Sequence, residues 1–271
     1  MKKNPIRFGC QTYTWQMSFD KYRGELEHII AAVKASGMAG VEPELCMLGD
    51  FGSQPNRLRN CLQSHEIALG GLCLACDWRG ERETPEERKQ ANAVIQMLSN
   101  YFPATFLVLC QLPGKDRQDL AERQRNALAC VNAVGARAAD AGIVAAFHPN
   151  SPSGSIFRAQ DDYDLLLEGL DFEKVGFAPD AGHIAKGGMD PVTIFRDSIA
   201  LIRHVHFKDM DQSGKWIEMG RGCIDFQGIY KVLREASYKG WIMVEDESEL
   251  AERDPDFATL LNGKYVVEHF N

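Results

Sequence analysis

The sequence predicts an α/β protein whose eight strand–helix pairs close into one (β/α)8 barrel. Short apolar or β-branched runs alternate with longer amphipathic segments from end to end, and no linker or low-complexity tract divides the 271 residues. Eight pairs give about 34 residues each, which suits a barrel of ~250 residues. A doubly wound sheet has the same local pattern, but Gln11–Trp15 stand where that fold carries a Gly-rich phosphate loop. We therefore expect a TIM barrel with a single domain over residues 1–271.

The strands follow from apolar runs that end at turn or helix signals. The first run is Ile6–Gln11, and Val175–Asp180 is typical of the later ones. A fully buried parallel strand reads as such a near-continuous apolar run. The eight predicted strands cover residues 6–11, 40–45, 67–76, 105–110, 143–148, 175–180, 201–207 and 241–245.

The helices follow from apolar positions three and four residues apart. In the first, Leu26, Ile29, Ile30 and Val33 share one face, and Gly37 marks its end. A later one begins with Thr84-Pro85-Glu86-Glu87, which offers a capping hydroxyl, Pro at the first helical position and Glu at the third. The predicted helices cover residues 22–36, 56–65, 84–101, 119–141, 161–170, 191–199, 226–237 and 256–269.

Composition excludes several classes of protein. A chain with 45% hydrophobic and 25% charged residues is not expected to be disordered. It has no apolar run of about 18 residues, so we expect no helix that spans a membrane. Its formal net charge of −8 argues against nucleic acid as the partner, because phosphate binding needs a basic surface. Residues 1–5 are basic but no apolar signal segment comes after them, so we expect a cytoplasmic protein.

The eight scattered cysteines fit reduced thiols in a cytosolic core. Cys73 and Cys76 have C-x-x-C spacing, but they fall in a predicted strand. Residues three apart on a strand point to opposite faces, so this pair is a poor metal site there.

Polar side chains gather at the carboxyl ends of the predicted strands, where a barrel of this kind places its chemistry. The amino-terminal ends show nothing comparable. The residues concerned are Gln11, Glu42, Glu44, Asp77, Trp78, His148, Asn150, Asp180, His183, His204, His206, Lys208, Asp209, Glu245, Asp246 and Glu247.

Strand alternation narrows this set. His206 and Lys208 share a face of the seventh strand, and Glu245 lies on the eighth. If these faces point into the barrel, His206 and Glu245 reach its upper layer together with Asp180. Imidazole and carboxylate donors in one cavity suit Mn²⁺, Mg²⁺, Co²⁺ or Zn²⁺.

Each residue also has a structural interpretation. Asp180 before Ala-Gly-His could cap a helix, His204 fits a core histidine, and Glu42 could form a salt bridge at the rim. Glu247 and Glu249 fit a solvated face. Glu245 is harder to explain structurally, because an unpaired buried carboxylate costs several kcal/mol. The functional interpretation therefore depends on the convergence of these residues on one rim of the barrel.

The chain resembles the xylose-isomerase-like TIM-barrel superfamily of sugar phosphate isomerases and epimerases, especially its inosose dehydratase and isomerase branch. D-x-G-H at Asp180–His183, H-x-H-x-K-D at His204–Asp209 and G-x-G-x-x-D-F at Gly220–Phe226 are fairly specific for the superfamily. The remaining matching segments are Gly9–Trp15, Gly40–Glu42, Phe147–Asn150 and Gly240–Glu245, so the likeness spans the chain.

The resemblance implies one divalent metal ion held by four ligands, of which Asp180, His206 and Glu245 match three. Many relatives have a Glu at the end of strand five, whereas this chain has Phe147-His148-Pro149-Asn150. His148 is therefore the candidate fourth ligand, with Asn150 the alternative. Without that Glu, epimerisation by two carboxylates is in doubt.

The resemblance also implies a sugar or cyclitol substrate whose ketone the metal polarises. Glu245 or His148 would remove the neighbouring proton, and Lys208, His183 and Arg221 would bind or protonate substrate oxygens. Gln11, Trp15, Glu42 and Asn150 complete the predicted substrate contacts. Reprotonation gives isomerisation or epimerisation, which is the function we expect. The alternative is loss of a β-substituent, which gives dehydration of an inosose or elimination from a 3-keto-glycoside. Barrels of this family often form a homodimer.

Two other functions compete with this one. An endonuclease IV-like phosphodiesterase would need more metal ligands than the seven histidines supply, because three of them fall outside the rim. A non-catalytic binding protein would not be expected to keep Asp180, His206 and Glu245 together.

Overall fold

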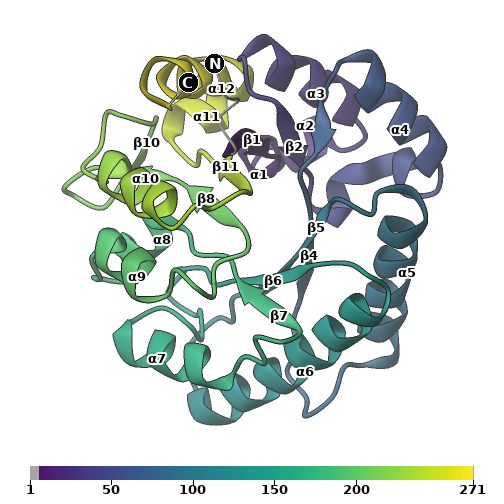
Figure 1. The fold of residues 1–271 in the computed structure, drawn as a ribbon, viewed down its shortest axis with the longest axis vertical. Coiled ribbons are helices and arrows are strands. Elements are labelled where there is room, and N and C mark those ends of the chain that lie inside the picture. The colour runs from purple at the N-terminus through teal and green to yellow at the C-terminus, as the bar shows by residue number, and fades with distance from the viewer. Residues whose placement is uncertain (1–5, 271) are drawn as a thin grey trace. The chain divides into compact units, whose positions relative to one another are not determined.

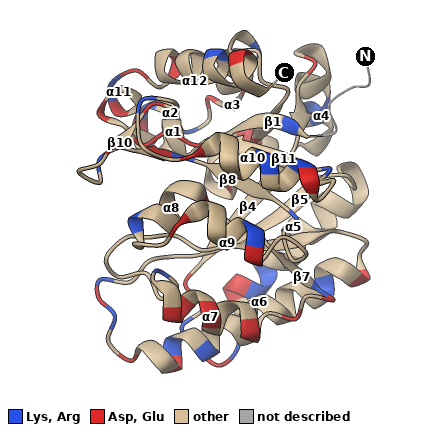
Figure 2. Ribbon diagram, turned by 60° about the vertical axis from the view of Figure 1, so that its left-hand side comes forward, with Lys and Arg blue, Asp and Glu red and all other residues tan. Residues whose placement is uncertain are grey.

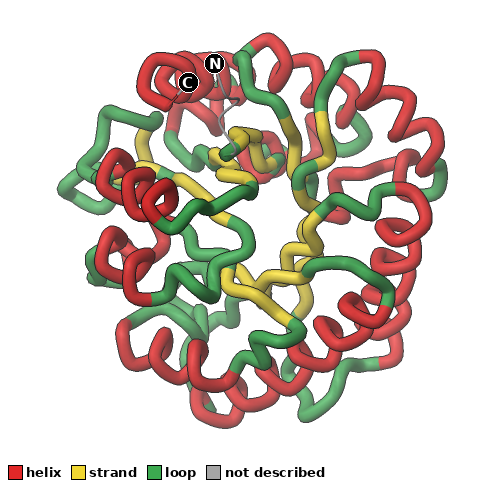
Figure 3. Tube along the Cα trace, in the orientation of Figure 1, coloured by secondary structure: helices red, strands yellow, loops and turns green. Residues whose placement is uncertain are grey.

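The computed structural model describes residues 6–270, and its main strands form two parallel sheets, one in each of two units (Figure 1). Unit 1 runs over Met1–Leu72 and Val205–Asn271, and unit 2 over Cys73–His204. Strands and helices alternate along both (Figure 3). The basic residues 1–5 lie outside the described part of the chain.

Unit 1 holds a five-stranded parallel sheet in the order β3-β2-β1-β11-β8. A short antiparallel hairpin, β9 and β10, comes after β8. The strands are β1 (Arg7–Gln11), β2 (Gly40–Glu42), β3 (Ala68–Leu69), β8 (Val205–Phe207), β9 (Asp209–Met210), β10 (Trp216–Ile217) and β11 (Trp241–Val244). The helices are α1 (Tyr13–Gln16), α2 (Phe19–Tyr22), α3 (Leu26–Ala35), the 3₁₀ helix η1 (Leu45–Gly52), α4 (Pro55–Ser64), α10 (Phe226–Glu235), α11 (Glu249–Arg253) and α12 (Pro255–Phe270).

Strand register sets two layers of side chains on one face of this sheet. Gly9 is in register with Gly40 and Met243, and Met243 with His206. Because side chains alternate along a strand, the residues two positions on share the same face. That next layer, at the carboxyl ends of the strands, holds Gln11, Glu42, Lys208 and Glu245.

The glycines beneath this polar layer make room for two large side chains. A Cβ at Gly40 would come within 2.5 Å of the Trp241 ring, and one at Gly70 within 2.9 Å of the same ring. A Cβ at Gly9 would meet Sδ of Met243 at 2.6 Å. Trp241 and Met243, at 1% and 0% exposure, therefore fill the space that these glycines leave.

Unit 2 holds a four-stranded parallel sheet in the order β4-β5-β6-β7. Cys110 is in register with His148, and Ala146 lies level with Val108 and Gly176. The strands are β4 (Gly71–Cys76, of which residues 73–76 belong to this unit), β5 (Phe106–Gln111), β6 (Ala145–His148) and β7 (Val175–Phe177). The helices are α5 (Pro85–Tyr101), α6 (Leu120–Asp140), α7 (Gln160–Gly169), α8 (Ala181–Lys186) and α9 (Pro191–Asp197). Residues of both charges occur along α6, whereas the charged residues of α7 are all acidic (Figure 2).

Most predicted elements are present, and the differences have local causes. The predicted strand 67–76 is broken at Gly70 into β3, which pairs with β2, and β4, which pairs with β5. The predicted helix 22–36 begins only at Leu26, because Gly24 interrupts it with φ of +84°. The capping box that we predicted at Thr84 and Glu87 is confirmed. Helices α1, α2, η1, α8 and α11 and the β9–β10 hairpin were not predicted.

The remaining expectations concern thiols and membranes. All eight cysteines lie in the described part of the chain and none of them forms a disulfide bond, and Cys73 and Cys76 are both buried in β4. Within residues 6–270, no helix has the length and apolar composition that crossing a bilayer requires. The single domain over residues 1–271 stays a prediction.

We predict that Gly40→Ala destabilises the protein by about 1–3 kcal/mol, because the new methyl group overlaps the Trp241 ring in a filled core. Gly52→Ala is the matched control, since its Cβ would lie 3.6 Å from Leu48, an ordinary contact. Urea unfolding of the two variants measures the difference. Equal midpoints would contradict this account of the core.

Candidate active site

Unit 1 carries a buried group of charged side chains, Glu42, His206, Lys208, Glu245 and Glu247, which we call the unit 1 cluster. Glu42, His206 and Lys208 are 0% exposed and Glu245 is 5% exposed. They come from the ends of β2, β8 and β11 or the residues just after them. Parallel pairing across β1 brings these ends to one edge of the sheet.

Within the unit 1 cluster, each charge contacts one of opposite sign. Nε2 of His206 lies 2.9 Å from Oε1 of Glu42, and its Nδ1 lies 3.6 Å from Oε2 of Glu245. Nζ of Lys208 donates to Oε1 of Glu245 at 2.5 Å and also to Glu247. Such pairing is what permits these groups to be buried.

The unit 1 cluster favours positive charge. Burial by itself lowers the pKa of His206, but the carboxylates of Glu42 and Glu245 outweigh it and raise this pKa to about 10. With a neutral imidazole, three carboxylates and one ammonium would leave two net negative charges. The donors are carboxylate oxygens and imidazole nitrogens, the set preferred by Mn²⁺, Co²⁺ and Zn²⁺. The residues present thus fit a divalent cation.

Glu247 corrects a sequence-based expectation. We expected it on a solvated face with Glu249, but its carboxylate pairs with Lys208 and its side chain is 20% exposed, against 90% for Glu249. Burial raises the pKa of Glu247, and Lys208 opposes that shift. Glu247 is therefore a second carboxylate partner of Lys208. Its position two residues beyond Glu245 was the available signal.

Aromatic residues lie beside the ammonium group and the carboxylates of the unit 1 cluster. The Trp216 ring, from the β9–β10 hairpin, is centred 5.1 Å from Nζ of Lys208. Burial, followed by the charges of Glu247 and Glu245, raises the pKa of Tyr13 to about 12. Tyr13 therefore stays a neutral hydroxyl near these carboxylates. Neither residue was among the predicted substrate contacts.

The first strand ends in a set of local contacts. Gln11 accepts from the backbone N–H of Tyr13, and Gln16 donates to Glu44 at 3.0 Å. Trp15 is 0% exposed and its indole N–H donates to Asp256 at 2.7 Å. The structure therefore gives Trp15 a packing and bonding role between α1 and α12.

Asp209 explains much of the sequence motif downstream of it. Its buried carboxylate accepts from the backbone N–H groups of Met210, Gly220, Gly222 and Ile224, at 2.8 to 3.3 Å. A Cβ at Gly222 would collide with this carboxylate. The G-x-G loop is thus held by one side chain. Arg221 within it pairs with Glu218 at 3.2 Å and is 65% exposed.

Unit 2 carries a second polar group, His148, Asn150, Ser151, Asp180 and His183, which we call the unit 2 cluster. Asp180 is 0% exposed, and its Oδ1 caps α8 by accepting from the N–H of His183 at 2.6 Å. The cap occupies one carboxylate oxygen, so a cap and a metal ligand are compatible roles for Asp180. The sequence did not indicate Ser151, whose Oγ lies 2.7 Å from Nδ1 of His183.

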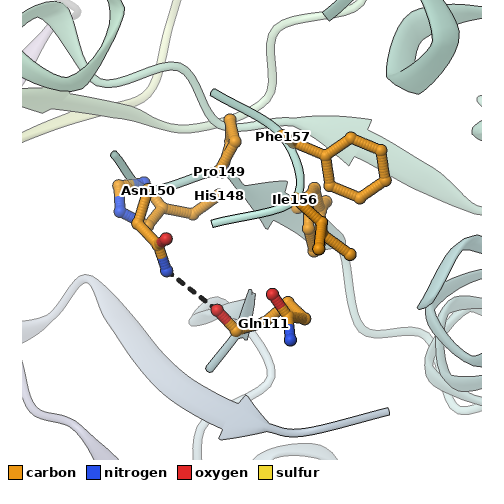
Figure 4. Close-up of a pocket in the computed structure, with 7 residues that line it drawn as sticks. Gln111, His148, Pro149, Asn150, Ile156 and Phe157 are labelled. Carbon is orange, nitrogen blue, oxygen red and sulfur yellow. Dashed lines mark hydrogen bonds between the residues drawn. The ribbon is translucent and has the colours of Figure 1, made fainter. Parts of the chain in front are cut away.

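His148 and Asn150 line a small cavity of ≈10 Å³ in unit 2 (Figure 4). Nδ1 of His148 lies 3.3 Å from the Ala178 carbonyl. The Asn150 amide donates to the Gln111 carbonyl at 2.8 Å, and Ser155 donates to its oxygen. Asn150 is therefore oriented by its neighbours. His204, expected in the core, packs its ring 5.1 Å from that of Phe106.

Comparison with known proteins identifies the class. The family model for the xylose isomerase-like TIM barrel matches residues 30–261, and this chain belongs to that family. The fold is accordingly a TIM barrel, as the sequence predicted.

Inosose dehydratases are among its relatives. That of Lacticaseibacillus casei is 31% identical over 156 residues, which are 51% of this chain and 52% of the relative, so the match spans about half of that protein. That of Bacillus velezensis is 25% identical over 301 aligned positions, covering 98% of this chain and 97% of the relative.

Solved structures share the fold at lower identity. The 3-keto-D-glucoside 4-epimerase YcjR of E. coli has a TM-score of 0.75 and 17% identity, with 97% and 99% of the two chains covered. The IolI protein with a binding zinc atom has a TM-score of 0.73 and 13% identity, with 97% of each chain covered.

We predict that Asp209→Asn lowers the free energy of unfolding by about 1.5–3 kcal/mol, because a charged acceptor of four backbone N–H groups is lost. Asp225→Asn is the control, since Asp225 caps α10 through one N–H, at 2.8 Å, and Asn also serves as a cap. Thermal unfolding of both variants measures this. A control that loses as much stability would contradict the role given to Asp209.

Proposed function

We propose that this protein is a divalent-metal-dependent enzyme that removes the proton next to the carbonyl of an inosose or keto-sugar. The observation that carries the proposal is the buried unit 1 cluster, in which a carboxylate and an ammonium, Glu245 and Lys208, lie 2.5 Å apart. Buried titratable groups with specific charge partners cluster at functional sites. The inosose dehydratase relatives support the substrate class.

We infer that His206 and Glu245, together with Asp180 and His148, would hold the cation, with Asn150 as the alternative to His148. The donor set of each cluster supports this, as does the zinc in a protein of the same fold. Manganese, cobalt, zinc and magnesium all suit such donors. When bound, the cation would act as a Lewis acid on the carbonyl oxygen of the substrate.

The side chains divide the remaining work. Glu245 accepts the α-proton, with His148 the alternative base, and burial keeps bulk water from competing for it. Lys208, held by Glu245 and Glu247, donates a proton to an oxygen of the substrate. His183 is oriented by Ser151 and would bind a hydroxyl group, as would Gln11 and Arg221.

The outcome depends on the step after proton removal. If Lys208 protonates a β-hydroxyl, the C–O bond breaks, a C=C bond forms and water leaves. If the proton returns to carbon, the enzyme is an isomerase or epimerase. The relatives named inosose dehydratase and the ammonium beside Glu245 favour dehydration. The epimerase among the structural neighbours supports the second candidate.

We predict about one divalent ion per chain in the purified or reconstituted protein, and its loss in the double variant Asp180→Ala/His206→Ala. Elemental analysis measures the content. The double variant Asp161→Ala/His269→Ala, which changes an exposed Asp and an exposed His, should keep the ion. A wild-type protein that takes up no divalent ion would overturn the metal-dependent mechanism.

We predict that an inosose incubated with the enzyme in D₂O exchanges its α-hydrogen and loses water. The charge-neutral double variant Lys208→Gln/Glu247→Gln should keep the exchange, while dehydration falls by about 10²–10⁴-fold, the usual contribution of a general acid. NMR follows the exchange, and product absorbance follows the dehydration. Exchange by the wild type without loss of water would contradict dehydration and leave isomerisation or epimerisation as the function to be tested.

A further inference from the structure

Asp246 is one of the polar residues predicted at the strand ends, and it belongs to neither cluster. It is 2% exposed, and its carboxylate meets the amide of Asn262 on α12, a residue that is also 2% exposed. Nδ2 of Asn262 donates to Oδ2 of Asp246 at 2.7 Å. Oδ1 of Asp246 accepts from the backbone N–H of Ser248 at 2.8 Å. Both oxygens of this buried carboxylate therefore have donors within unit 1.

Asp246 lies in residues 245–248, which we call the carboxylate loop because it carries Glu245 and Glu247. These two side chains pair with the ammonium group of the unit 1 cluster. The backbone N–H of Asp246 donates to Oγ1 of Thr14 at 3.1 Å, and Thr14 is buried. The backbone and the side chain of Asp246 thus both hold the loop, and they position the carboxylates on either side of it.

The other end of the Asn262 amide holds a second segment. Oδ1 of Asn262 accepts from the backbone N–H of Met219 at 2.8 Å. Met219 lies in residues 216–222, which we call the hairpin segment. This segment carries Trp216, beside the unit 1 cluster, and Arg221, a predicted substrate contact. A carboxylate accepts and a backbone N–H donates, so only one orientation of the amide satisfies both of its partners.

We propose that Asp246 and Asn262 are positioning residues through which α12 holds the carboxylate loop and the hairpin segment in fixed positions relative to each other. Neither residue belongs to the unit 1 cluster, so each acts on it through the backbone of these segments. The catalytic consequence rests on the proposed function, in which Glu245 accepts the α-proton. A displacement of about 1 Å at a reacting group can lower the rate about 10²-fold.

Amide hydrogen exchange tests this link without any substrate. Asn262→Leu removes both hydrogen bonds, so exchange in the carboxylate loop and in the hairpin segment should become about tenfold faster, while β1 and β11 keep their protection. Asn132→Leu is the matched control. The amide of Asn132 also bridges two backbone groups, those of Gly169 at 2.9 Å and Asp171 at 3.0 Å, but it does so in unit 2. It should leave both segments unchanged.

Exchanging the two residues separates positioning from simple packing. Asp246→Asn alone sets two amides against each other, and Asn262→Asp alone sets two carboxylates against each other. Each should lower kcat for α-hydrogen exchange of an inosose in D₂O about 10²-fold and leave KM nearly unchanged. In Asp246→Asn/Asn262→Asp the donor and the acceptor trade places, while the N–H groups of Ser248 and Met219 keep their acceptors. This double variant should recover most of the wild-type kcat and protection.

Recovery in the double variant supports the proposal, because a loss of packing alone would add up instead of cancelling. A double variant as impaired as the single ones overturns it, and so does unchanged hydrogen exchange in Asn262→Leu. If the wild type acts on no inosose, the proposed function fails, and the hydrogen exchange of the single and double variants still decides the positioning role. If Asn262→Leu does not fold, the same comparison decides it.

Discussion

The need to pair buried charges constrains the sheet of unit 1 more than any other interaction. Glu42, His206, Lys208 and Glu245 are nearly inaccessible to water, and ions so buried are tolerated only with partners at close range. Their partners come from different strands, so the parallel register of β2, β1, β11 and β8 must be kept. A slip of one residue would turn a strand's charged side chains to the opposite face.

The pairing of buried charges also links the packing of unit 1 to the chemistry of its polar residues. Below Glu42, Lys208 and Glu245, the side chains of Trp241 and Met243 fill the space that Gly9, Gly40 and Gly70 leave. The buried charges therefore lie on densely packed side chains, where they interact strongly because water is excluded. The imidazole of His206 lies between the carboxylates of Glu42 and Glu245, and such a site favours a cation. Family membership and the inosose dehydratase relatives connect this preference with sugar or cyclitol chemistry.

Sequence motifs proved to combine structural and functional roles. The D-x-G-H motif caps α8 with Asp180, and its His183 is oriented by Ser151. The Asp of H-x-H-x-K-D binds the backbone of the G-x-G loop, and its carboxylate leaves no space for a Cβ at Gly222. Glu247 was expected on a solvated face and Tyr13 was given no role, because the charges near each of them come from other segments of the chain. The importance of Glu247 and Tyr13 becomes visible only from the positions of Lys208 and Glu245 in the folded chain.

The sequence by itself determined the alternation of strands and helices, the family and the polar residues at the strand ends. The alternation follows from local periodicity and capping, which neighbouring residues set. The family follows from the resemblance of motifs such as D-x-G-H and H-x-H-x-K-D to those of known members. Tertiary structure alone decided which charges pair, as with Glu42 and His206, and that the third predicted strand breaks at Gly70. It also decided that Trp15 bonds to Asp256. These contacts join residues far apart in the chain, which meet only after the strands have paired in register and the side chains have packed.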